Sequence, residues 1–146
     1  MLLALESGKF KVWAIAIIRE SMTYEIPVLD FLAQYASGPD SKSVAGYKAI
    51  WARYAENGRS AFTTDLLHEV DKNDAIYEFI KGRLRVFCYF AGDGGVVLTN
   101  GTLKQGNKVD SAAVAEAIRT KNSEAAMLAK LITPKAEATK LERRKK

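Results

Sequence analysis

The sequence has few of the residues that build covalent or metal-bound frameworks. Its 146 residues include one cysteine, Cys88, and one histidine, His68. A single cysteine cannot form an intramolecular disulfide, and these two residues are too few for a zinc site of the usual cysteine and histidine kind. The chain also lacks an uninterrupted apolar run of roughly 18 residues, the length that suggests a membrane span. We therefore expect a cytoplasmic protein without a membrane span, disulfides or structural zinc.

The apolar start of the chain, MLLALESGKFKVWAIAII, does not have the pattern of a signal peptide. Glu6, Lys9 and Lys11 interrupt the run, and no basic segment precedes it. Proline is scarce, at three residues, while 48% of the residues are hydrophobic. This composition excludes disorder of the whole chain and predicts one domain with a sizeable core.

Positive charge is concentrated in the second half of the sequence. The net charge is +5, yet residues 1–80 carry eight basic and eleven acidic residues. Residues 81–121 carry seven basic and three acidic residues, and residues 135–146 carry six basic and two acidic ones. We interpret residues 1–134 as one domain and residues 135–146 as a disordered basic tail. The basic middle block indicates a surface of the domain that faces a polyanion.

The first half of the sequence predicts one strand followed by two helices. Residues 10–17, FKVWAIAI, are rich in β-branched and aromatic residues and predict the strand. A short amphipathic helix follows from Pro27, which suits a first helical turn. A second helix begins at Ser41, carries an apolar stripe that includes Trp51, and ends at Gly58. The two helices are expected to form a hairpin that lies on a sheet.

The segment AIYEFIKGRLRVFCYF at residues 75–90 predicts a β-hairpin with Lys81 and Gly82 as its two-residue turn. This register places Phe79 opposite Leu84. The face expected to point into the core is apolar and carries Tyr77, Phe79, Leu84, Val86, Cys88 and Phe90. The opposite face combines two arginines with aromatic residues and carries Ile76, Glu78, Ile80, Arg83, Arg85, Phe87 and Tyr89.

The remaining sequence predicts a further strand and a last helix. AGDGG at residues 91–95 is expected to be a hairpin turn, because the lysine and hydroxyl residue of a phosphate loop do not follow it. The strand VVLTNGTL comes next, and Asp110 suits the N-cap of a helix that ends at Pro134. The expected fold class is α+β: a small mostly antiparallel sheet of about four strands, with an N-terminal helical hairpin and a C-terminal helix packed on one face.

Few residues are suited to nucleophilic or metal chemistry. His68 is the one histidine available for a catalytic triad, and we expect it to be a structural or surface residue; Asp71 and Asp74 lie in a turn-like segment. Glu78 opposite Arg85 predicts a cross-strand ion pair. The remaining candidates are the cations of the basic block, which are Arg83, Arg85, Lys104, Lys108, Arg119 and Lys121. Each of them has an ordinary alternative role as a solvated surface charge.

Two segments give these cations a more specific interpretation. YEFIKGRLRVFCYF at residues 77–90, followed by a glycine turn and VVLTNGTLKQGNKVDSAAVAEA at residues 96–117, resembles the RelE/HigB toxins of bacterial and phage toxin–antitoxin systems. In that family a strand containing glutamate leads into a strand containing arginine, then a lysine-rich loop and a helix. The earlier segments VLDFL and NGR are similar to the N-terminal helices of the same group. The resemblance therefore covers most of residues 10–121.

The resemblance implies a toxin that acts as a ribosome-dependent mRNA endonuclease, needs no metal or other cofactor, and inhibits translation. In this chemistry a ribose 2′-hydroxyl attacks the adjacent phosphate, and fixed cations stabilise the charge that develops. Catalytic roles fall on Lys104, Lys108 and Arg85, with a lysine exchanging protons. Roles in holding the RNA backbone fall on Arg83, Asn107 and Arg119. The implied partners are the ribosome with its mRNA and a small helix-turn-helix antitoxin.

The sequence departs from the family pattern at several positions. Thr102 stands where the family has an aromatic residue, Gln105 where it has a second lysine, and Asp110 where it has a proline. The final helix lacks the tyrosine of many relatives, for which Tyr89 is a candidate replacement. Two alternatives therefore stay open. One is a same-fold toxin or binding protein that acts on a host protein, as the related ParE toxins do, and the other is a phage-type regulatory protein that binds nucleic acid.

Overall fold

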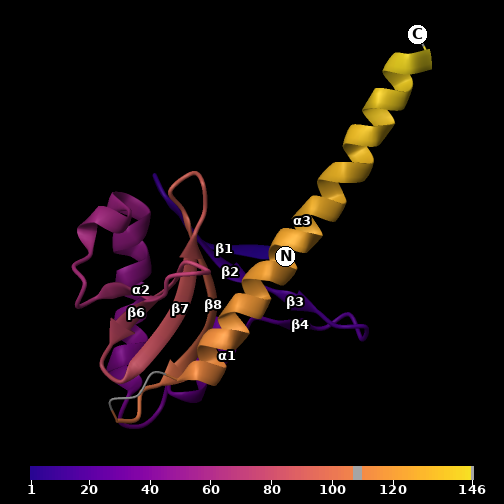
Figure 1. The fold of residues 1–146 in the computed structure, drawn as a ribbon. Helices are drawn as coiled ribbons and strands as arrows, with labels where there is room; N and C mark the ends of the chain where they lie inside the picture. The colour runs from indigo at the N-terminus through magenta and orange to yellow at the C-terminus, as the bar shows by residue number, and fades with distance from the viewer. Residues whose placement is uncertain (107–109, 146) are drawn as a thin grey trace.

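A six-stranded mixed sheet forms the centre of the molecule, with the strand order β1-β2-β8-β7-β6-β5 (Figure 1). The computed structural model describes the backbone of residues 1–106 and 110–145, and side chains as far as residue 128. The strands of this sheet are β1 (Leu2–Ser7), β2 (Lys11–Ile15), β5 (Leu67–Asp71), β6 (Ile76–Lys81), β7 (Leu84–Phe90) and β8 (Val96–Leu103). Neighbouring strands are antiparallel except β2 and β8, which pair in parallel.

One face of the sheet carries the main core, beneath α1 (Pro27–Gln34) and α2 (Ser41–Asn57). α1 packs mainly on β8, and α2 lies over β1, β2 and β6. Both helices bury the apolar stripes that the sequence predicts, including Phe31 and Trp51. Gly58 ends α2 with a φ of 73°, and the short 3-10 helix η1 (Arg59–Ala61) follows.

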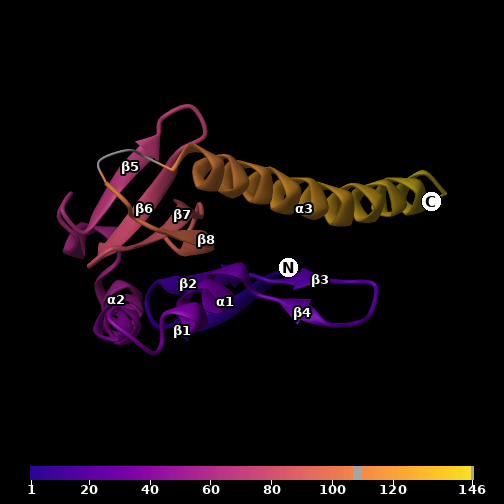
Figure 2. The ribbon, with the colours of Figure 1, turned by 90° about the horizontal axis from the view of Figure 1, so that it is seen from below.

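The opposite face of the sheet is covered in part by α3 (Ser111–Lys145), so helices lie on both sides of the sheet (Figure 2). The first turns of α3 bury Ala113 and Ala117 against Ile76 and Phe87 in a second, smaller apolar cluster. α3 then continues as a long arm away from the sheet (Figure 1). The predicted helix end at Pro134 is wrong, because a proline inside a helix removes one hydrogen bond and bends the helix without necessarily stopping it. The division into a domain of residues 1–134 and a tail stays a prediction.

A separate two-stranded ribbon, β3 (Ile17–Ile18) and β4 (Tyr24–Glu25), projects from the body beside the arm of α3 (Figures 1 and 2). Its exposed hydrophobic side chains include Ile18 and Tyr24. In the part of the chain that the structure describes, no helix is long and apolar enough to cross a membrane.

The predicted fold class, a sheet of about four mostly antiparallel strands beneath a helical hairpin, is wrong. The sheet has six strands and is mixed. The sequence prediction omits β1, whose apolar residues resemble the start of a signal peptide. It also omits β5, which is a short, charged strand at the sheet edge. α1 and α2 pack on different strands rather than as a hairpin, and α3 lies on the other face. The parallel β2–β8 pair joins residues far apart in sequence, which no local pattern can predict.

The β6–β7 hairpin differs from its predicted register by two residues. Phe79 lies opposite Val86, so the turn consists of Gly82 and Arg83 rather than Lys81 and Gly82. Glycine occupies the first turn position because the backbone there has a φ of 58°, typical of a type II′ turn. An even shift keeps every side chain on its own face of the sheet. The predicted core-facing residues therefore do lie in or against the main core.

Candidate functional site

A cavity of about 260 Å³ opens on the face of the sheet that α3 covers only in part. Its walls come from β6, the start of β7, the end of β8 and the residue before α3. The lining residues are Glu78, Arg85, Phe87, Thr102, Leu103, Lys104, Gln105 and Asp110. The cavity thus contains Arg85 and Lys104. It also contains Thr102, Gln105 and Asp110, the three positions at which the sequence differs from the toxin pattern.

Arg85 is the most buried cation of the cavity, with 12% of its side chain exposed. Its Nη1 donates to the carbonyl oxygens of Gly82, at 2.7 Å, and Leu84, at 3.2 Å. Its Nε lies 3.8 Å from Oε1 of Glu78, which is too long for a hydrogen bond. Among the described residues this buried Nε has no hydrogen-bond partner, and the Glu78 carboxylate at 3.8 Å is the anion beside it. The predicted ion pair between Arg85 and Glu78 is confirmed, although the two residues are diagonal neighbours on β7 and β6 and do not stand directly opposite one another.

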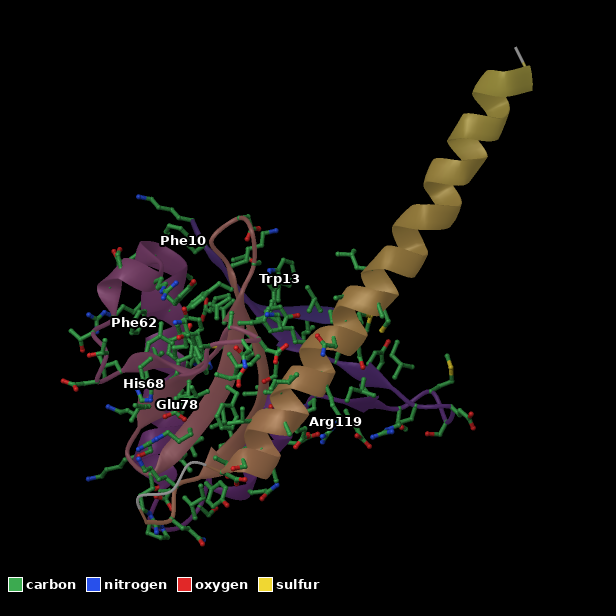
Figure 3. All side chains as sticks on the ribbon, in the orientation of Figure 1. Phe10, Trp13, Phe62, His68, Glu78 and Arg119 are labelled. Atoms are coloured by element: carbon green, nitrogen blue, oxygen red, sulfur yellow. The ribbon has the colours of Figure 1, made fainter. Side chains whose placement is uncertain are left out.

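Glu78 is a buried carboxylate that also contacts His68. It stands directly opposite His68 in the antiparallel pair of β5 and β6, and Nε2 of His68 lies 2.9 Å from Oε1 of Glu78 (Figure 3). Nδ1 of His68 donates to the carbonyl oxygen of Thr64 at 3.1 Å. One carboxylate oxygen is therefore shared between an imidazole and, at greater distance, the Arg85 guanidinium.

Two of the three departures from the toxin pattern contact one another. The hydroxyl of Thr102 donates to Oδ2 of Asp110 at 2.7 Å, and Oδ1 of Asp110 accepts from the N–H of Ala113 at 3.0 Å. The predicted N-cap of α3 is thus confirmed. The Thr102 hydroxyl, followed by the backbone N–H groups at the start of α3, lowers the pKa of Asp110. This contact fixes the end of β8 to the start of α3.

Lys104 lies exposed at the rim of the cavity, directly after β8. Its backbone N–H donates to the carbonyl oxygen of Arg83 at 2.7 Å, which ties the beginning of the lysine segment to the β6–β7 turn. Asn107 and Lys108, the other candidates in this segment, lie outside the described residues.

Two of the candidates for binding the RNA backbone lie elsewhere. Arg83 forms a two-pronged contact with Asp40, immediately before α2, with Nε–Oδ1 at 3.2 Å and Nη2–Oδ2 at 2.8 Å. Arg119 lines a second cavity of about 460 Å³, between α3 and residues 15–18, on the other side of α3 from His68 and Glu78 (Figure 3). Arg83 and Arg119 therefore lie apart from the cavity that holds Arg85 and Lys104.

Tyr89, the proposed replacement for the missing aromatic, also lies outside the cavity. It packs with the smaller apolar cluster, and the ammonium of Lys121 lies 5.5 Å from its ring centre. Burial raises the pKa of Tyr89 to about 12. A half-buried phenol beneath α3 accounts for Tyr89 without a role in the site.

The lining of the cavity balances two cations, Arg85 and Lys104, against two carboxylates, Glu78 and Asp110. Asp110 is committed to the helix cap, whereas Glu78 faces the cavity beside Arg85. Among the side chains that the structure describes, no group of three or more His, Cys, Asp or Glu residues is placed to hold a metal ion.

Sequence reasoning missed His68 and Glu78 as a pair. LLHEVD does not alternate strictly between apolar and polar residues, so little in the sequence marks it as a strand. With that strand paired to residues 76–81, His68 falls on the same face as Glu78.

Compared with models of known protein families and with curated proteins, the sequence gives no match.

Proposed function

We propose that this protein is a metal-independent endoribonuclease of the toxin type, which cleaves mRNA by attack of a 2′-hydroxyl on the adjacent phosphate. The observation that carries the proposal is the cavity that brings the Arg85 guanidinium together with the Glu78 carboxylate and Lys104. Its 260 Å³ lies below the roughly 300 Å³ at which drug-sized ligand sites begin. A sugar with its phosphate suits such a volume better than a large cofactor.

The cations have distinct parts in this reaction. Arg85 is held by the carbonyls of Gly82 and Leu84, so it offers a fixed positive charge to the non-bridging phosphate oxygens. That charge stabilises the pentavalent transition state more than the ground state, because the negative charge on phosphorus oxygens increases during attack. Lys104, at the rim, gives a proton to the departing 5′-oxygen. Lys108 retains its assignment as a second lysine of the same segment.

The resemblance to the RelE/HigB toxins extends this proposal to the cellular setting. We infer cleavage of mRNA on the ribosome, in the cytoplasm, with inhibition of translation as the result. A small helix-turn-helix antitoxin is the proposed partner that keeps the toxin inactive. The order of Glu78, Arg85, Lys104 and the α3 helix along the chain supports this assignment.

Inducible expression with genome-wide mapping of mRNA 5′ ends tests the proposal. The wild-type chain should arrest growth and create new 5′ ends within translated reading frames. Arg85→Ala should lower cleavage about 100- to 1,000-fold, because one preorganised charge is lost from the transition state. Lys104→Ala should lower it at least about 100-fold, as expected for a general acid.

Lys72→Ala is the matched control, since Lys72 is exposed and outside the cavity. It should cleave as the wild type does. Growth arrest without new 5′ ends would contradict the nuclease assignment and favour the second candidate, a same-fold protein that binds a host protein. The exposed apolar residues Ile18 and Met127 at the second cavity are the observation that supports this second candidate.

A further inference from the structure

The position of Glu78 needs an explanation beyond phosphate binding. The Glu78 side chain is 11% exposed, lines the cavity and lies beside Arg85, where its carboxylate would repel a bound phosphate. A site selected only to hold RNA would favour a neutral hydrogen-bond donor at this position. A carboxylate next to a bound phosphate is suited instead to accept a proton from the attacking 2′-hydroxyl.

His68 offers a route by which the proton can leave the Glu78 carboxylate. Its Nε2 lies 2.9 Å from Oε1 of Glu78, and 37% of its side chain is exposed at the edge of the sheet. Nδ1 is fixed by the carbonyl oxygen of Thr64. Strand pairing sets the contact, because His68 and Glu78 are opposed residues of β5 and β6. The imidazole therefore connects the buried carboxylate to solvent.

The charged groups around this pair come from three other elements. Arg85 on β7 lies 3.8 Å from Oε1 of Glu78, while Lys104 after β8 and Asp110 before α3 face the same cavity. Both measured contacts to Glu78 use Oε1, which leaves Oε2 for the nucleophile. Arg85 lines the same cavity, so its guanidinium and the Glu78 carboxylate both border the space in which a phosphate would bind.

We infer that Glu78 is the general base of the reaction and that His68 is a positioning residue that relays the proton to solvent. This inference rests on the proposed function. Oε2 of Glu78 accepts the proton as the 2′-O–H bond breaks and the bond from 2′-oxygen to phosphorus forms. The bond from phosphorus to the 5′-oxygen then breaks, and that oxygen takes the Lys104 proton. The products are a 2′,3′-cyclic phosphate and a 5′-hydroxyl. The carboxyl group of Glu78 then turns so that its proton faces Nε2 of His68, the imidazole takes this proton, and the resulting imidazolium gives one to water.

The test uses the full-length protein and ribosomes programmed with a defined mRNA, with single-turnover cleavage rates measured from pH 5 to 9. For the wild type the rate should rise with pH and then level off, as expected for a general base. Glu78→Gln should lower the rate about 100- to 10,000-fold and remove this dependence, while RNA binding stays equal or becomes tighter. His68→Gln should lower the rate about tenfold and displace the pH profile. Glu78→Asp should recover part of the activity.

Glu69→Gln is the control, because Glu69 is an exposed acid on β5 next to His68 and outside the cavity. Thermal unfolding of each variant separates lost chemistry from lost folding, and His68→Gln, at the sheet edge, tests the relay if Glu78→Gln is unstable. Wild-type cleavage with unchanged rates and pH profiles in the Glu78 and His68 variants overturns this inference alone. Absence of wild-type cleavage on programmed ribosomes overturns the proposed function together with it.

Discussion

At the scale of single residues, the contact between Thr102 and Asp110 shows that two departures from the toxin pattern are one structural feature. Threonine and aspartate replace an aromatic residue and a proline, and they meet at 2.7 Å across the segment that carries Lys104. Asp110 in turn caps α3 through Ala113. One contact thus holds the end of β8 against the start of α3.

Replacing Asp110 by alanine should destabilise the fold by about 1 kcal/mol at neutral pH, the usual cost of an N-cap. The pKa of Asp110 is lowered from 3.8 in the folded protein. Its carboxylate therefore stabilises the fold above that ordinary value, and the contribution is lost as the pH falls through the lower folded-state pKa. Urea unfolding from pH 7 to about pH 3 should show the gap between wild type and Asp110→Ala narrowing with acid.

Asp110→Asn serves as the control for this prediction, since asparagine caps helices without a titrating group. It should stay close to the wild type at neutral pH. A gap between wild type and Asp110→Ala that does not change with pH would contradict the role of the ionised carboxylate.

At the scale of elements, the approach of α1 to β8 depends on the absence of a side chain at Gly101. A β-carbon at this position would overlap the ring of Phe31, which α1 places against the strand. Gly101 also lies on β8 shortly before Lys104. The same close contact therefore packs the helix and fixes the strand from which the lysine segment leaves.

Gly101→Ala should destabilise the protein by about 1–3 kcal/mol, because a methyl group must be inserted into a packed contact. Denaturant unfolding measures the change. Gly92→Ala is the matched control, since a β-carbon there meets nothing within 4 Å, and it should stay within about 0.5 kcal/mol of wild type. Equal effects of the two substitutions would argue against the tight approach.

Local sequence patterns predicted most individual elements and failed where pairing is set by distant residues. The strands of the β6–β7 hairpin follow from alternation, and its turn follows from a glycine. The predicted register is wrong by two residues, because Gly82 takes a positive φ and is the first residue of the turn. β5 carries charges on a short strand, so its weak alternation did not stand out. Without β5, the contact between His68 and Glu78 could not be predicted.

At the scale of the whole molecule, helices on both faces divide the basic block that looks continuous in the sequence. The presence of Arg85 and Lys104 in one site could be predicted from the motif order, because the strand and the segment after the next strand meet at one end of the sheet. The diversion of Arg83 to Asp40 and of Arg119 to the far side of α3 could not. Those positions depend on long-range packing.

Removal of residues 135–146 tests whether they form a tail outside the folded domain. A chain that ends at residue 134 should keep its thermal unfolding midpoint, because the described contacts of α3 with the sheet lie in its first turns. It should bind RNA more weakly and with a shallower salt dependence, since the deleted segment carries six basic residues. Calorimetry and filter binding at several salt concentrations measure the two effects, and a midpoint lower by several degrees would place the segment within the domain.

The contact between Thr102 and Asp110 has a consequence for how this edge of the molecule opens. The hydrogen bond joins the end of β8 to the residue that caps α3. The chain between residues 102 and 110 is therefore closed into a loop, and its ends cannot separate while this bond holds. Release of the first turn of α3 from the sheet and opening of this loop should occur as one local unfolding event.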